Sequence, residues 1–155
     1  MKKIIIFLWL TVAIFSETVS VDMDFLLKSH PKLATVKKEL ETQKTKLEKD
    51  LNAKGTKLKT EYETLSKKGS KITDAEKQSF AKKEKELSDL YIKSQKDLAT
   101  LESKKINALL AEIKTAINTY ASSKKYDAVV EKKTIYYGNA KIKDISNDVL
   151  KTIKK

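Results

Sequence analysis

A pair of apolar residues four apart recurs every 11 residues along the first half of the chain. The pairs are Val36 and Leu40, Leu47 and Leu51, and Leu58 and Tyr62. An 11-residue repeat corresponds to about 3.67 residues per turn, so it predicts a long helix with a nearly straight or slightly right-handed apolar seam. Because the other faces carry Lys, Glu, Thr and Gln, only one narrow stripe can be buried. Such a helix needs one partner helix rather than a surrounding core.

The same chain supplies that partner, because Leu87, Leu98 and Leu109 repeat the 11-residue spacing. Between the two stripes, Gly69 can end a helix in the left-handed conformation. Thr73 and Glu76 then match a capping box, which starts a helix. The stop and start signals lie only a few residues apart, so they predict a helix–turn–helix tip.

The predicted first helix begins near Pro31, and the second runs from about Asp74 to about Ser122. Together they form an antiparallel hairpin arm over residues 31–123 with its tip near residues 66–73. An arm of about 40 residues is roughly 60 Å long at 1.5 Å per residue. Because that exceeds the width of a compact domain of this size, we expect the arm to project.

Both ends of the chain alternate like strands. In residues 17–23, Val19, Val21 and Met23 share one face, and Asp24 can cap a short helical turn after them. Near the other end the predicted elements are strands over 126–131, 134–137 and 140–145, with a turn at Lys132-Lys133, a break at Gly138-Asn139 and a final helix capped by Ser146. A two-stranded hairpin is marginal alone, so we expect both ends to meet in one sheet.

The predicted fold class is therefore α+β: a helical hairpin projecting from a small β-sheet body built from residues 17–30 and 124–155. This body is small for a stable core, and apolar residues on both sides of its strands predict cover from other subunits. The residues predicted to form the body core or the subunit interface are Val19, Val21, Met23, Tyr126, Val129, Val130, Ile135 and Tyr137.

The first 16 residues read as a signal peptide. Lys2-Lys3 precedes an apolar run from Ile4 to Phe15, which is too short to span a bilayer. We expect export, with cleavage after Ser16; the alternative is an uncleaved membrane anchor.

The charge and the residue types narrow the range of functions. The net charge is +12, every basic residue is lysine, and there is no cysteine. The missing arginine argues against sequence-specific DNA reading, and interleaved acidic residues argue against nucleic acid in general. His30, the only histidine, stands beside Pro31, and the chain has no cysteine or second histidine to complete a metal site. We therefore expect a structural role for His30 and no metal. No catalytic motif or cofactor fingerprint is present, so we expect no enzyme and no cofactor.

The layout resembles the OmpH/Skp family of periplasmic chaperones. The residues that carry the resemblance are VDMD after the first strand pattern, SHPKL before the first helix, and YDAVVEKKTIYYGNAKIKDISNDVLKTI at the end. The resemblance implies a homotrimer in the periplasm whose helical arms surround a cavity. It also implies an ATP-independent holdase that binds unfolded outer-membrane proteins there. Some members of the family carry a basic lipopolysaccharide-binding patch that includes arginines; this chain has no arginine, so that site is not carried over.

Several alternatives stay open from the sequence. The tip lysines Lys67, Lys68 and Lys71 either touch client or an anionic membrane surface, or simply keep the tip soluble. The tyrosines Tyr126, Tyr136 and Tyr137 pack the body and its interface, or form a binding patch. The alternative function is an exported coiled-coil structural or adhesive protein, anchored by an uncleaved N-terminus.

Overall fold

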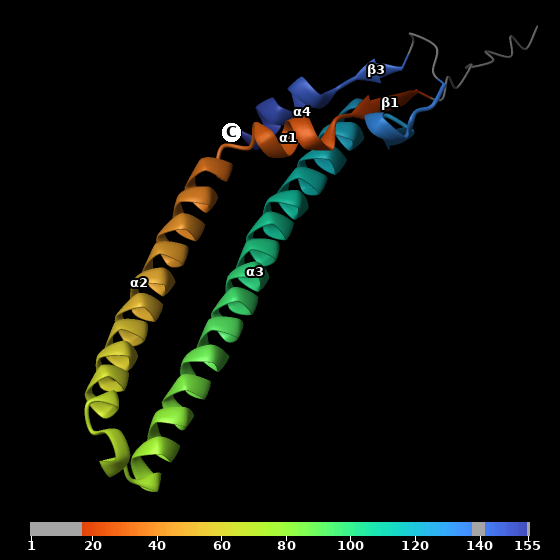
Figure 1. Cartoon of the computed structure of the whole chain (residues 1–155). Coiled ribbons are helices and arrows are strands. Elements are labelled where there is room, and N and C mark those ends of the chain that lie inside the picture. Colours follow the sequence, from red (N-terminus) through yellow and green to blue (C-terminus); the bar gives the residue numbers. More distant parts are fainter. Residues whose placement is uncertain (1–16, 138–141, 155) are drawn as a thin grey trace, which may run out of the picture. The chain divides into compact units, whose positions relative to one another are not determined.

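The structure is a computed structural model that describes residues 17–137 and 142–154. The expected signal peptide and the expected break at Gly138-Asn139 lie outside these residues. The described chain divides into two units (Figure 1). One is a helical unit, Leu27–Glu112, and the other is a body made from the residues up to Leu26 and from Ile113 onward.

The helical unit is an antiparallel hairpin of α2 (Leu33–Ser66) and the first part of α3 (Asp74–Lys124) (Figure 1). A 3-10 turn, Gly69–Lys71, joins them, and Gly69 has the positive φ of 55° that the sequence predicted for this tip. The capping box is confirmed: Glu76 N–H donates to Thr73 Oγ1 at 3.3 Å, and Thr73 N–H donates to Glu76 Oε2 at 2.9 Å. α2 begins two residues after the expected Pro31, which lies in a turn.

Four ion pairs along the hairpin show how its two sides align. They are Lys32–Glu112 at 2.8 Å, Glu39–Lys105 at 2.6 Å, Glu61–Lys83 at 2.6 Å and Lys68–Glu76 at 2.5 Å. In each pair the two residue numbers add to 144, so one antiparallel register holds from the base of the hairpin to its tip. Such constant register is what two helices with the same 11-residue period allow, since neither seam drifts away from the other.

The body contains a three-stranded parallel sheet in the order β2-β1-β3. The strands are β1 (Thr18–Val21), β2 (Ala128–Glu131) and β3 (Lys143–Asp144). Val19 of β1 is in register with Val129 of β2 and with Lys143 of β3. Parallel strands need a long crossover connection, and here the whole helical hairpin lies between β1 and β2 in the sequence.

The predicted hairpin of two C-terminal strands does not form. Lys132–Thr134 is a 3-10 turn, and Ile135–Tyr137 follows it outside any strand. β1 instead occupies the centre, where its backbone pairs with β2 on one edge and β3 on the other. The prediction paired neighbours in sequence, whereas β1 offers two edges to segments more than 100 residues away.

The helix starts of the body also differ from the expected ones. β1 ends at Val21, and Met23 opens α1 (Met23–Lys28) instead of closing the strand. Asp22, not Asp24, caps α1, because Phe25 N–H donates to Asp22 Oδ1 at 2.9 Å.

Ser146 lies inside α4 (Ser146–Ile153) rather than capping it. Its Oγ accepts from Asp22 N–H at 2.8 Å and donates to Asp144 Oδ1 at 2.5 Å. The hydroxyl therefore joins the end of β1 to β3.

The core of the body gathers apolar residues from β1, α1, the end of α3, Ile145 and α4. Its fully buried side chains are Val19, Leu26, Ile113, Ile145 and Val149. In β1, Val19 and Val21 face one side of the sheet and Ser20 the other, and all three are at most 3% exposed. Both faces of the central strand are therefore covered within a single chain.

α3 ends in a Schellman motif that directs the chain into β2. Tyr126 N–H donates to Ala121 O at 3.1 Å, and Lys125 N–H donates to Ser122 O at 3.2 Å. Lys125 takes the left-handed position with φ of 60°, where glycine is usual.

Candidate functional site

The residues predicted for the body core fall into three groups. Val19 and Val21 are buried. Half-buried positions are Met23, Tyr126, Val129, Val130 and Ile135. Tyr137 is 97% exposed, so it is no part of the core of a single subunit, and neighbouring Tyr136 is fully exposed as well. A subunit interface on the half-buried residues and Tyr137 stays a prediction.

Ile145 belongs to the body core but was missing from the predicted list. It lies directly after β3 and inside the strand predicted over 140–145, but the predicted list took no residue from that strand. Its position directly before α4 was the available signal, because a residue preceding a helix often packs back onto it.

His30 has a structural role at the start of α2. Its side chain is fully buried, and its Nδ1 accepts from Lys32 N–H at 3.2 Å. Nε2 lies 3.4 Å from Glu112 Oε2 in a geometry that makes no hydrogen bond. Burial lowers the pKa of His30, although Glu112 opposes this, so the ring is neutral near pH 7. Within residues 17–137 and 142–154, no group of three His, Cys, Asp or Glu side chains is placed to hold a metal ion.

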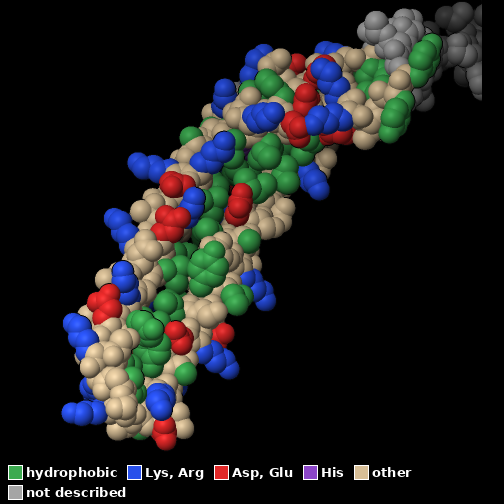
Figure 2. Space-filling model, in the orientation of Figure 1, with side chains coloured by type: hydrophobic (Ala, Val, Ile, Leu, Met, Phe, Trp, Pro, Cys, Tyr) green, Lys and Arg blue, Asp and Glu red, His purple; other side chains and the backbone are tan. Residues whose placement is uncertain are grey.

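The seam between α2 and α3 is thin and open to solvent. Hydrophobic side chains follow the line between the two helices, and lysines project from the outer borders of the hairpin (Figure 2). The stripe leucines in the middle, such as Leu51, Leu58 and Leu87, are only half-buried. Tyr91 is 55% exposed. A two-helix contact has no third element to cover these side chains, so grooves run along both sides of the seam.

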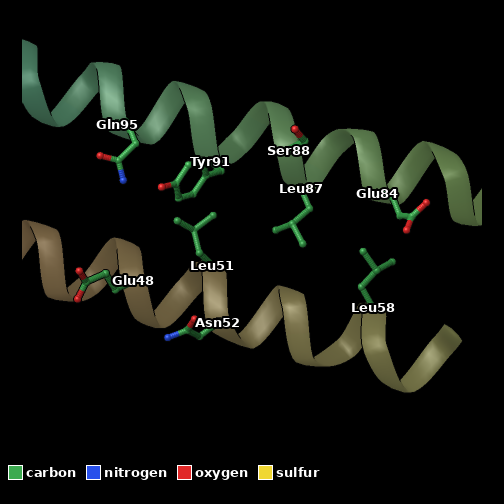
Figure 3. A pocket seen from close by; sticks show the side chains of 9 residues that line it. All are labelled: Glu48, Leu51, Asn52, Leu58, Glu84, Leu87, Ser88, Tyr91 and Gln95. Atoms are coloured by element: carbon green, nitrogen blue, oxygen red, sulfur yellow. The ribbon is translucent and has the colours of Figure 1, made fainter. Parts of the chain in front are cut away.

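One of these grooves, here called the Tyr91 groove, has a volume of about 770 Å³. Its apolar lining is Leu51 and Leu58 from α2 with Leu87 and Tyr91 from α3. These four side chains point into the space between the helices (Figure 3). Uncharged polar side chains also line it: Asn52, Ser88 and Gln95. The charged side chains among the described residues that line the groove are Glu48 and Glu84, and none of the lining residues is a lysine.

The opposite side of the same seam, here called the lysine groove, has different chemistry. It shares Leu58 and Leu87 with the Tyr91 groove, but its charged lining residues are Lys54, Lys57 and Lys83 together with Glu61 and Glu86. Lys83 pairs with Glu61 at 2.6 Å. The two sides of one narrow stripe therefore differ in formal charge. The Tyr91 groove has two glutamates and no lysine, and the lysine groove has three lysines and two glutamates. The sequence predicted the stripe but not this division, which follows from where the residues beside each leucine fall around the helix.

The tip lysines do not form one uniform patch. Lys68 pairs with Glu76 at 2.5 Å, while Lys67 and Lys71 are exposed. Lys68, followed by the hydrogen bonds from Thr73, lowers the pKa of Glu76 to about 2. One of the three lysines is thus engaged in holding the tip together.

None of the helices in the described part of the chain is long and apolar enough to cross a membrane.

These features define a class of protein: an α+β chain in which a long two-helix hairpin is inserted between the first and second strands of a small parallel sheet. Comparison with known proteins agrees with this class. The sequence model of the family described as outer membrane protein (OmpH-like) matches residues 18–153. The chain belongs to this family.

The relatives of known name are chaperones. The chain is 33% identical to the chaperone protein Skp of Salmonella typhimurium over 115 residues and 32% identical to that of Escherichia coli K12. Each match covers 70% of this chain and 64% of the relative's length. The crystal structure of a candidate OmpH-like outer membrane chaperone from Caulobacter crescentus has the same fold, with a TM-score of 0.70 at 20% identity. That match covers 88% of this chain and 82% of the Caulobacter chain.

Proposed function

We propose that this protein is a periplasmic, ATP-independent holdase that binds unfolded outer-membrane proteins between helical arms. The relatives that share its sequence over 115 residues are named chaperones, which supports this reading. The observation that carries the proposal is the thin seam of the hairpin. Its leucines are half-buried, so the arm presents apolar surface in short stretches between charged side chains.

Interrupted apolar surface suits a holdase. A continuous patch would bind other folded proteins or cause self-association. Short apolar stretches beside lysines can hold an unfolded chain weakly at many points. The net charge of +12 falls to +10 when Lys2 and Lys3 leave with the signal peptide, and it attracts acidic clients at long range, an effect that salt screens.

The direct experiment is a suppression assay without ATP. A urea-unfolded β-barrel outer-membrane protein is diluted into buffer with or without the mature chain, and turbidity is followed. We expect equimolar chaperone to keep the client soluble at low salt and less so at high salt. No reduction in turbidity at low salt would favour an exported coiled-coil structural or adhesive protein instead.

We also propose that the mature chain acts as a homotrimer. Support comes from the size of the body and from the half-buried Val129, Val130 and Ile135, which a second subunit would cover. Light scattering of the chain from Glu17 onward is the test. A mass of one chain at micromolar concentration would contradict the trimer and the enclosed cavity with it.

A further inference from the structure

The centre of the Tyr91 groove is a gap in the leucine stripe. Gly55 follows Leu51 by four residues and precedes Leu58 by three, which places it on the same face of α2. Around the helix it falls between Leu51 and Asn52, two residues that line this groove. A Cβ at Gly55 would meet no atom within 4 Å. The space is therefore open, and no side chain of the hairpin fills it.

The middle of the hairpin also lacks cross-helix ion pairs. Glu39–Lys105 and Glu61–Lys83 are two 11-residue repeats apart. Asp50 stands midway between Glu39 and Glu61. Residues that face each other across the hairpin have numbers that add to 144, so Asp50 lies opposite Ser94, which is 5% exposed and uncharged. In the described hairpin, no ion pair is formed between α2 and α3 along this interval. Side-chain packing, mainly of half-buried leucines, thus holds the two helices together there.

The length of the groove matches an extended polypeptide. Leu51 and Leu58 are seven residues apart, or about 10 Å along the helix. In an extended chain, side chains on one face recur about every 7 Å. Two same-face side chains therefore fit between the two leucines. Strands of outer-membrane barrels alternate apolar and polar residues, so they carry such pairs along their whole length.

The ends of the groove set the charge of its occupant. Glu48 lies at one end and Glu84 at the other, with Tyr91 and the leucines between them (Figure 3). Glu48 is 4.0 Å from Lys44, and Glu84 makes no ion pair with any described residue. Because no lysine lines this groove, its field favours basic or neutral residues beside the bound apolar side chains and disfavours acidic ones.

We propose that the Tyr91 groove is a client-binding subsite that takes two same-face apolar side chains of an extended, unfolded segment flanked by basic or neutral residues. This inference rests on the proposed holdase function and assigns it to one side of the arm. The lysine groove on the other side also contains leucines, but its three lysines and two glutamates give it a different charge and it has no aromatic side chain.

Site-specific photo-crosslinking tests which side touches the client. Benzoylphenylalanine is placed at Asn52, in the Tyr91 groove, or at Lys57, in the lysine groove on the same helix. Each mature variant is mixed with a urea-diluted barrel protein and irradiated. We expect about fivefold more client adduct from position 52. Equal adducts, or more adduct from position 57, would overturn the assignment.

Filling the groove is the second test. Gly55→Leu places a leucine in the open space, and Ala53→Leu adds the same side chain beside the lysine groove. We expect Gly55→Leu to weaken client affinity about fivefold while Ala53→Leu changes it less than twofold. Circular dichroism checks that both variants keep their helix content. Unchanged affinity in a folded Gly55→Leu variant would refute the proposal, and the crosslinking result stands independently if that variant does not fold.

Synthetic ten-residue peptides test the charge rule. One alternates apolar and polar residues between terminal lysines, and the other replaces those lysines with glutamates. We expect only the lysine-ended peptide to compete for the adduct at position 52, and Glu48→Gln with Glu84→Gln to remove the difference. Equal competition by both peptides would contradict the charge rule.

The same crosslinking samples distinguish the client from other molecules that could occupy the Tyr91 groove. If position 52 crosslinks to a second copy of the chain, or to phosphatidylglycerol vesicles, in preference to the client, the groove serves assembly or lipid and the proposal is wrong. Failure of the unmodified chain to suppress turbidity would instead refute the holdase function. A working holdase whose client contacts avoid position 52 would refute the subsite alone.

Discussion

The central strand of the body and the stripe of the hairpin carry similar apolar side chains in different environments. Val19 and Val21 of β1 are 0% and 3% exposed, while Leu51, Leu58 and Leu87 of the hairpin are half-buried. Strand β1 has a partner on each edge and cover on each face, whereas each stripe leucine meets only the opposite helix. Apolar surface in the hairpin thus remains exposed to solvent, and each leucine stabilises the fold less.

The largest difference is expected from one substitution made in both regions. Leu26→Ala in the body removes a fully buried side chain and should lower the free energy of unfolding by about 3–4 kcal/mol. Leu58→Ala in the hairpin removes a half-buried one and should cost about 1–2 kcal/mol. Urea titrations followed by circular dichroism measure both values. Equal losses would show that the seam is packed as tightly as the body and would end the comparison.

Acid should weaken the body through Asp144. Burial raises the pKa of this carboxyl, but hydrogen bonds from Lys132 and Ser146 outweigh it and lower the pKa from 3.8 to about 2. Because the folded pKa is the lower one, the carboxylate stabilises the fold above pH 3.8, and this stabilisation is lost as the pH falls toward 2. The Asp144 side chain is 37% exposed, so screening reduces the expected loss to about 1.5 kcal/mol.

Asp144→Asn is the variant that measures this effect. The difference in unfolding free energy between it and the unmodified chain should be largest near pH 6 and should shrink toward pH 2. Urea titrations at several pH values give the two curves. A difference that stays constant with pH would mean that Asp144 does not hold the body by its charge.

Thr73→Ala should loosen the tip of the hairpin without affecting the body. The substitution removes the hydroxyl that accepts from Glu76 N–H, and loss of such a cap costs about 1 kcal/mol. Hydrogen exchange should show faster exchange of the first-turn amides of α3, including Lys77, with β1 amides unchanged. Thr73→Ser keeps the hydroxyl and should exchange like the unmodified chain. Faster exchange in both units would show that they unfold together.

The hairpin was largely predictable because its signals are local. The 11-residue spacing gave both helices, Gly69 gave the positive φ at the tip, and Thr73 with Glu76 gave the start of α3. Each of these features depends on contacts within a few residues, so the order of residues specifies it. The difference between the two sides of the stripe was less predictable, since it depends on which residues flank the stripe after the two helices have aligned.

The sequence predicted which segments join the sheet but not how they pair. The predicted strands over 17–23, 126–131 and 140–145 contain β1, β2 and β3. Residues 134–137 were also predicted as a strand, but Thr134 ends a 3-10 turn and 135–137 lie outside any strand. Pairing of β1 with both C-terminal segments depends on contacts across more than 100 residues, and no local pattern records such a choice. Ser146 shows the same limit, because its role as a link between Asp22 and Asp144 exists only once these segments have met.

The smallest effect expected is that of the ion pairs that set the register of the hairpin. Glu61 and Lys83 are 2.6 Å apart, and their side chains are 35% and 49% exposed, so their coupling should be only about 0.5 kcal/mol. A double-mutant cycle with Glu61→Gln and Lys83→Gln isolates this coupling from the other effects of each substitution. The swapped pair Glu61→Lys with Lys83→Glu keeps the register and should recover most of the loss. We expect the leucine stripe to hold the helices together more strongly than the ion pairs do. A coupling above about 2 kcal/mol would show instead that the ion pairs are the stronger contribution.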